Sequence, residues 1–387
     1  MQAESGTAIG SCSTSPGLRF YNRRRALGRQ ARQKPYSACI SRSSPRTRFA
    51  PWLKTLENGL SELHKFIFEG IPVRGILVRL TDAWTEILRR RSSNTQTGAY
   101  AEPVQNMLGE LLAAAVLMQS NIRFDGALVM QIFGDGPVRL AVAEVQADLS
   151  LRATATVVGE IAEGSTLGAM VNVANAGRCA ITLDPQARFP GSQPYQGVVP
   201  LYGDQGDKLE RLSEVLEHYM LQSEQLDTAL VLAANAHVAA GLLIQRLPAQ
   251  GVGNLAAGRS GGDEDQIGHN GDYQRIALLS RTLKREELLE LDVDTILRRL
   301  FWEEKVVRFA PSPDEHAPRF KCSCSREKVG AMLVGLGQAE AESIIAEQGR
   351  IEVACEFCGT QYRFDPIDAA QLFRPASERP QGSSTPQ

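Results

Sequence analysis

The chain has 387 residues, of which 43% are hydrophobic, and its formal net charge is −2. This length allows a sizeable buried core and favours more than one domain, and the lack of an apolar run of about 18 residues argues against a membrane-spanning helix. The N-terminus shows no continuous apolar segment of a secretory signal. Seven cysteines, four of them in two close pairs, suit a reducing compartment better than a disulfide framework.

Residues 1–58 are predicted to form a basic, disordered extension. They hold eleven Lys or Arg and two acids, a net charge of +9, which leaves −11 for residues 59–387. Three interpretations stay open: an organelle transit peptide, a basic arm that touches nucleic acid, or a translation start assigned too far upstream. The acidic remainder argues against nucleic acid or an anionic membrane as the main partner.

Residues 59–247 are predicted to form a core domain of the α+β class, in which antiparallel strands pack against helices. Apolar residues recur at helical spacing over 102–120, with Pro103 placed in the first turn. A second helix is expected over 209–222. Alternating apolar residues predict strands over the ranges 122–132, 140–145, 153–158 and 229–234.

Two segments of this domain resemble catalytic motifs but have simpler interpretations. Gly134-Asp135-Gly136 lacks the residues of a phosphate-binding loop, so it is predicted to be a hairpin turn. Ser223-Glu224-Gln225, near His218, has no nucleophile elbow or oxyanion donors, so a helix end is expected. Because no catalytic constellation is found, the protein is predicted not to be an enzyme.

A linker is predicted over residues 248–317, first glycine-rich (251–271) and then helical. From Tyr273 to Phe301, apolar residues recur at helical spacing, so this long segment should present one face for burial. The last residues, 374–387, are expected to be a frayed tail.

A C-terminal zinc domain is predicted over residues 318–373, because four cysteines lie there in two pairs. Cys322 and Cys324 form a C-x-C motif, and Cys355 and Cys358 form a C-x-x-C motif after one small helical segment. Four thiolates can close a tetrahedral site around one Zn²⁺, with bonds of about 2.3 Å. Such a site has no open position for water, so hydrolytic chemistry is excluded.

Other residues near the cysteine pairs have lesser expected roles. Gly359 is expected to turn the backbone so that N–H groups point at the sulfurs. His316 is a possible substitute ligand, although the four cysteines already complete the tetrahedron. The remaining cysteines, Cys12, Cys39 and Cys179, are expected to be buried or incidental thiols.

The role of the zinc is open at this point, because a structural site and an oxidant-sensing site use the same four thiols. A module of about 55 residues with few large apolar side chains is near the lower limit for a self-supporting core. Structural zinc contributes on the order of 10–16 kcal/mol to such modules, so losing it should unfold this one. If residues 273–301 pack against the module, its unfolding would release an apolar face.

Several motifs make the chain similar to the redox-regulated 33 kDa heat-shock chaperone (holdase) family over about residues 60–373. The motifs are Phe-Glu-Gly-Ile-Pro-Val-Arg-Gly (68–75), Phe-Gly-Asp-Gly-Pro (133–137), Tyr-Gln-Gly-Val-Val (195–199), Ser-Glu-Gln-Leu (223–226), Arg-Leu-Phe-Trp-Glu-Glu (299–304), Phe-Lys-Cys-Ser-Cys-Ser-Arg-Glu (320–327) and Cys-Glu-Phe-Cys-Gly (355–359). The extension 1–58 and the insertion 251–271 depart from the family pattern.

The resemblance implies a cytoplasmic, ATP-independent chaperone that is an inactive monomer when reduced, with one Zn²⁺ on Cys322, Cys324, Cys355 and Cys358. It further implies that hypochlorite, or peroxide with heat, forms the disulfides Cys322–Cys324 and Cys355–Cys358 and releases the zinc. The zinc domain and linker then unfold, and the protein dimerises and holds unfolding client proteins. Two disulfides that each close a very small loop would constrain the chain far less than the zinc did.

Two other functions compete with this one. A constitutive zinc ribbon would bind a protein or nucleic acid in its reduced, zinc-loaded form. A thiol-disulfide oxidoreductase would use Cys355 and Cys358, and it would need an attacking thiol of low pKa, often at a helix N-terminus.

Overall fold

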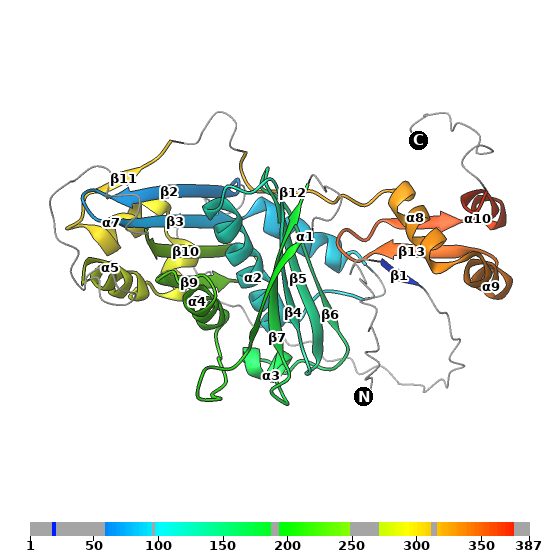
Figure 1. Cartoon of the computed structure of the whole chain (residues 1–387), viewed down its shortest axis with the longest axis horizontal. Coiled ribbons are helices and arrows are strands. Elements are labelled where there is room, and N and C mark those ends of the chain that lie inside the picture. The colour runs from blue at the N-terminus through cyan, green and yellow to red at the C-terminus, as the bar shows by residue number, and fades with distance from the viewer. Residues whose placement is uncertain are drawn as a thin grey trace, which may run out of the picture. The chain divides into compact units, whose positions relative to one another are not determined.

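The computed structural model describes residues 59–94, 97–186, 193–247, 271–310 and 316–374, and the backbone of residues 18–20. The other residues lie outside the described part, so the expectations for most of the extension, for the insertion up to residue 270 and for the tail from residue 375 stay predictions. The chain divides into two compact units, Ser43–Cys322 and Ser323–Gln387 with Met1–Arg42, which are described one at a time (Figure 1).

One sheet of the first unit has five antiparallel strands in the order β11-β2-β3-β10-β9. Its strands are β2 (Glu62–Phe68), β3 (Val73–Leu80), β9 (Thr228–Ala234), β10 (Ala239–Arg246) and β11 (Val306–Arg308). The central strands β3 and β10 are buried on both faces, because each contributes side chains to two separate hydrophobic cores.

The other sheet of this unit has six strands in the order β12-β6-β5-β4-β7-β8. They are β4 (Gly126–Phe133), β5 (Val138–Gln146), β6 (Ser150–Val157), β7 (Arg178–Pro185), β8 (Tyr195–Pro200) and β12 (Arg319–Phe320). Neighbours are antiparallel except β12, which runs parallel to β6. The short strand β12 leads directly into the first cysteine pair.

Helix α2 (Glu102–Asn121) lies between the two sheets and packs against strands of both (Figure 1). A helix covered on two sides needs apolar residues over most of its surface, and thirteen residues of α2 are buried. Gly109 permits the closest approach, since a Cβ there would come within 2.5 Å of the Ala234 Cβ atom. The other helices of the core are α1 (Asp82–Ser92), α3 (Leu167–Val171) and α4 (Leu212–Gln222).

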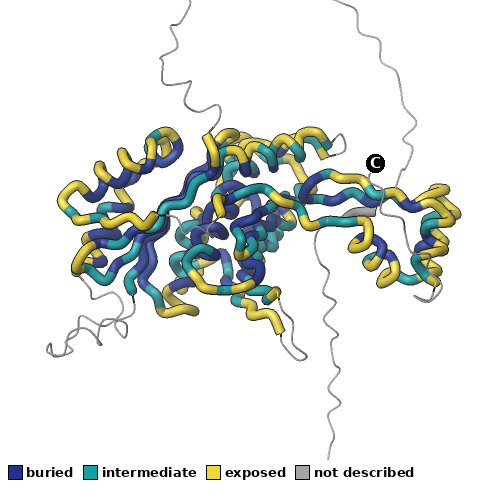
Figure 2. The backbone as a smooth tube through the Cα atoms, turned by 90° about the horizontal axis from the view of Figure 1, so that it is seen from above, coloured by how far each residue is buried: buried dark blue, intermediate teal, exposed yellow. Residues whose placement is uncertain are grey.

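The predicted long segment 273–301 is three helices, α5 (Gly271–Arg281), α6 (Arg285–Glu290) and α7 (Val293–Phe301). The chain breaks before α7 because Asp292 caps that helix by accepting a hydrogen bond from the Thr295 N–H. The buried side chains of these linker helices share one core with the five-stranded sheet. In Figure 2, exposed residues follow the outer turns of helices, while the strands are largely buried.

The second unit has a three-stranded antiparallel sheet in the order β1-β13-β14. Its elements are β1 (Leu18–Phe20), α8 (Arg326–Leu336), α9 (Gln338–Gln348), β13 (Ile351–Cys355), β14 (Gln361–Phe364) and α10 (Pro366–Leu372). Two helices, rather than one, therefore separate the cysteine pairs. Strand β1 belongs to the extension, where no regular element was expected.

The structure confirms the α+β class and the main predicted elements. The helix expected over 102–120 is α2, the one over 209–222 is α4, and the strand over 229–234 is β9. The first predicted strand begins later than expected, at Gly126. Within the described residues, no single helix is long and apolar enough to cross a membrane, although α8 and α9, bent by 106° at their junction, pass that test as a pair.

Candidate metal centre

The four cysteines of the two predicted motifs come together in space. The Sγ atoms of Cys322, Cys324, Cys355 and Cys358 all lie within 4.8 Å of one another, and none of these four cysteines is in a disulfide. Two of these sulfurs, on Cys324 and Cys358, are 3.3 Å apart. A tetrahedral zinc site with bonds of about 2.3 Å has sulfurs about 3.8 Å apart, so the residues fit Zn²⁺.

The second cysteine pair is positioned by a tight turn between β13 and β14. Cys355 ends β13, its N–H donates to the Thr360 carbonyl at 2.9 Å, and the Gly359 N–H donates to the Cys355 carbonyl at 2.8 Å. Gly359 has a φ of 73°, a left-handed conformation that favours glycine. The turn thus places the thiol of Cys358 beside that of Cys355.

Two hydroxyl groups that the sequence analysis missed contact the sulfurs. The Tyr362 phenol donates to Cys324 Sγ at 3.1 Å, and the Thr360 hydroxyl oxygen lies 3.1 Å from Cys358 Sγ. The N–H of Gly359 itself donates to the Cys355 carbonyl, and the expectation that backbone N–H groups of this turn point at the sulfurs stays a prediction. Burial and the hydrogen bond to Cys324 raise the pKa of Tyr362, which keeps its O–H available as a donor.

Cys322 is held by the six-stranded sheet of the first unit. Strand β12 pairs with β6, and the Lys321 N–H donates to the Leu151 carbonyl at 3.0 Å. A guanidinium nitrogen of Arg152, on β6, lies 3.9 Å from Cys322 Sγ, while the Arg152 side chain pairs with Glu144 at 2.6 Å. The guanidinium therefore lies within reach of a proposed metal ligand.

Other predicted residues have structural roles. Cys179 is buried in β7, where desolvation raises the pKa of its thiol to about 12. His316 is not part of the cysteine group that the described residues form, and Cys12 and Cys39 lie outside the described part of the chain. The segment at 223–225 is a helix end as predicted, because Ser223 caps α4.

The Gly134-Asp135-Gly136 segment is the hairpin turn that was predicted, between β4 and β5. The Asp135 carboxylate accepts three backbone N–H groups, from Val173, Ala174 and Ala176. These bonds join the turn to the segment after α3, so the Asp135 carboxylate has a structural role.

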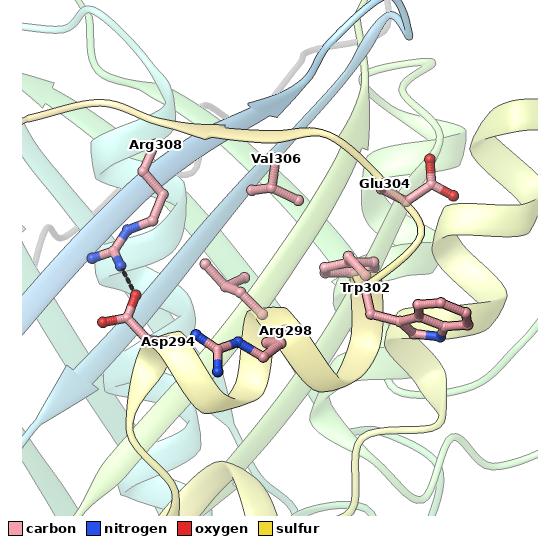
Figure 3. A pocket seen from close by; sticks show the side chains of 8 residues that line it. Asp294, Arg298, Trp302, Glu304, Val306 and Arg308 are labelled. Carbon is pink, nitrogen blue, oxygen red and sulfur yellow. Dashed lines mark hydrogen bonds and ion pairs between the residues drawn. The ribbon is translucent and has the colours of Figure 1, made fainter.

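A pocket of about 300 Å³ lies between α7 and β11 (Figure 3). Its lining includes the exposed indole of Trp302 and an ion pair between Asp294 and Arg308. No thiol, hydroxyl or imidazole is among the residues that line it.

Comparison with known proteins agrees with the motifs. A sequence model of the family described as Hsp33 protein matches residues 61–365. The 33 kDa chaperonin of Chromobacterium violaceum is 43% identical over 316 residues, which are 82% of this chain and 95% of that protein. The 33 kDa chaperonin of Methylobacillus flagellatus is 39% identical over 80% of this chain and 94% of its own length.

A solved structure shows the same fold. The crystal structure of the 33 kDa chaperonin (heat shock protein 33 homolog) from Thermotoga maritima aligns with a TM-score of 0.59 at 21% identity. The alignment covers 80% of this chain and 97% of that one. Residues before 61, including β1, precede the matched family region.

Proposed function

The chain belongs to the Hsp33 protein family, and on this premise we propose that it is an ATP-independent chaperone activated by oxidation of its four grouped cysteines. In the reduced state, Cys322, Cys324, Cys355 and Cys358 would bind one Zn²⁺, and the protein would be an inactive, cytoplasmic monomer. In the oxidised state it would be a dimer that holds unfolding proteins. No catalytic role is proposed.

The observation that carries this proposal is the convergence of four thiols from two pairs, with 30 residues between Cys324 and Cys355. A metal bound there supplies a cross-link between distant parts of the module. Disulfide formation within each pair, Cys322–Cys324 and Cys355–Cys358, would leave only local cross-links. Two thiols and one hypochlorite ion give one disulfide, chloride and water, so both pairs together consume two hypochlorite ions.

The linker helices lie over the apolar surface that we propose for client binding. They cover one face of the five-stranded sheet, where large side chains such as Phe66, Phe68 and Leu77 are buried. If the linker unfolds together with the cysteine module, this face becomes exposed. Contiguous apolar surface of that kind binds other proteins in non-native states.

The test combines zinc release with client protection. Hypochlorite is added to the reduced, zinc-loaded protein, and released zinc is measured with a colorimetric chelator. We expect about one equivalent of zinc to leave as about two hypochlorite ions are consumed, and to return after reductant and zinc are added. Oxidised protein should suppress aggregation of a heat-denatured client, whereas reduced protein should not.

A matched control is Cys179→Ser, which removes a buried thiol outside the group and should leave zinc release unchanged. Cys355→Ser should prevent stable zinc binding. Zinc that stays bound during oxidation, or equal client protection by both redox forms, would contradict the proposal and favour a constitutive zinc ribbon. Turnover in insulin reduction would instead favour an oxidoreductase, although Cys355 lies at a strand end and not at a helix N-terminus.

A further inference from the structure

Part of the N-terminal extension is a strand of the cysteine module. Strand β1 runs antiparallel to β13, with Leu18 opposite Cys355, Arg19 opposite Ala354 and Phe20 opposite Val353. Figure 1 shows β1 beside β13. This pairing brings residues separated by more than 330 positions into one sheet, and one of them is a proposed metal ligand.

The edge of β13 that faces β1 would otherwise be unpaired. On its other edge β13 pairs with β14 in a register that ends at Ala354 opposite Gln361. The N–H and C=O groups of Cys355 are used in the turn toward Thr360 and Gly359. Because successive peptide groups of a strand point to opposite edges, the N–H and C=O groups of Ala354 point toward β1, at Arg19.

A third strand matters energetically in so small a unit. An isolated two-stranded hairpin is marginally stable in water, and a third strand or packing against helices supplies the stability that it lacks. An open edge is also a template for pairing with other chains. Strand β1 therefore both completes the sheet and covers its exposed edge next to Cys355.

We propose that Leu18–Phe20 is an intramolecular edge strand that holds β13 closed and slows the opening of the cysteine site. This inference rests on the proposed function for its consequence, because slower opening means slower loss of zinc during oxidation. The strand pairing itself does not depend on chaperone activity. Since residues 18–20 precede the matched family region, the device belongs to the extension that this chain adds.

The test compares Arg19→Pro with Arg19→Ala in the full, reduced, zinc-loaded chain. Proline removes the N–H that faces Ala354 and is excluded from paired strand positions. Alanine removes the same side chain and charge but keeps the N–H. We expect amide hydrogen exchange at Ala354 to become roughly tenfold faster in the proline variant and to stay unchanged in the alanine variant.

The second readout is the rate of zinc transfer to a chelator in the presence of hypochlorite, which should also rise roughly tenfold in Arg19→Pro only. Equal exchange at Ala354 in both variants would overturn the inference, as would faster exchange without faster zinc loss. If both rates change as expected but oxidised protein fails to protect clients, the edge strand stands and the proposed chaperone function fails.

Discussion

The Tyr362 phenol is a polar group that should affect how strongly the proposed ligand Cys324 binds the metal. Its O–H donates to Cys324 Sγ at 3.1 Å, and donors of this kind orient a ligand and stabilise its negative charge. Tyr362→Phe keeps the ring and removes the donor. We expect the zinc dissociation constant to rise about tenfold, measured by competition with a chelator at fixed pH.

The control for that variant is Tyr219→Phe, which removes a phenol that donates to Glu224 at 2.8 Å, away from the cysteines. It should leave zinc affinity unchanged. An unchanged affinity in Tyr362→Phe as well would mean that the phenol does not act on the metal ligands.

Glu110 on α2 is a carboxyl group whose protonation should affect stability near neutral pH. Burial raises its pKa from 4.5 to about 7, although Arg285 of α6 lies 3.4 Å away and opposes the shift. The folded protein therefore binds this proton more tightly than the unfolded chain does. The contribution of Glu110 to the free energy of unfolding should fall as the pH rises from about 4.5 to above 7.

Glu110→Gln should remove this decrease in the free energy of unfolding at high pH. Since the Glu110 side chain is 22% exposed, solvent weakens the effect, and we expect a gain of about 1–2 kcal/mol at pH 8 and little change at pH 5. Urea unfolding at both pH values measures it. Glu86→Gln is a control in which the free energy of unfolding should change in the opposite direction at pH 8. Arg89 and Arg90 lower the Glu86 pKa to about 2, so the charged Glu86 side chain stabilises the folded protein. A Glu110→Gln effect equal at both pH values would show that the charge is not responsible.

At the scale of elements, hydrogen bonds from Arg79 of β3 hold helix α6 against the five-stranded sheet. Its guanidinium donates to the carbonyls of Leu288, Leu289 and Leu291 at 2.6–3.0 Å, and its side chain is 8% exposed. These carbonyls are at the C-terminal end of α6, where no backbone N–H of the helix can reach them. The Arg79 side chain thus links the five-stranded sheet, the proposed client-binding surface, to helix α6, which packs on it.

Arg79→Met should loosen the linker while the protein is still reduced. Leaving buried carbonyls without a donor costs about 2–4 kcal/mol, and this cost falls on linker docking. We expect more binding of a fluorescent apolar dye and faster proteolysis between α6 and α7. Arg74→Met is the matched control, because Arg74 is on the same strand but donates to Gln245 within the sheet. Equal dye binding by the two variants would show that Arg79 does not hold helix α6 on the sheet.

The elements that could be predicted are those with a clear period. Helix α2 was predicted from its spacing of apolar residues, whereas β3 was not identified. Its sequence, Val-Arg-Gly-Ile-Leu-Val-Arg-Leu, does not alternate, because Ile76 and Val78 enter one core and Val73 and Leu77 enter the other. A strand buried on both faces loses the alternation that identifies strands.

The cysteine group followed from spacing alone, but its surroundings did not. Tyr362 lies four residues after Cys358, and a strand after the turn brings it back to the sulfurs, so this partner was within reach of sequence reasoning. Arg152 is 170 residues from Cys322, and only the pairing of β12 with β6 brings them together. Sequence spacing carries no information about such a contact.

At the scale of the whole molecule, the two units differ greatly in how they are stabilised. The first unit contains two large hydrophobic cores. The buried residues of the second unit's core are Val329, Leu333, Ala341, Ile351, Val353, Phe364 and Ala369. A core of this size rarely stabilises a domain without a metal or disulfide, so the units should respond differently to loss of zinc.

Removing zinc from the reduced protein with a strong chelator should therefore unfold the second unit and leave the first intact. The helical circular dichroism of α8, α9 and α10 should be lost, and amide exchange over 323–374 should approach that of an unfolded chain.

Trp84 reports on the first unit, because it is fully buried and its indole N–H donates to the Asn235 carbonyl at 2.7 Å. In a variant with Trp52→Phe and Trp302→Phe, Trp84 emission should stay constant. If the second unit instead keeps its helices and its protection without zinc, zinc release alone cannot unfold it, and the proposed activation by oxidation would lack its physical cause.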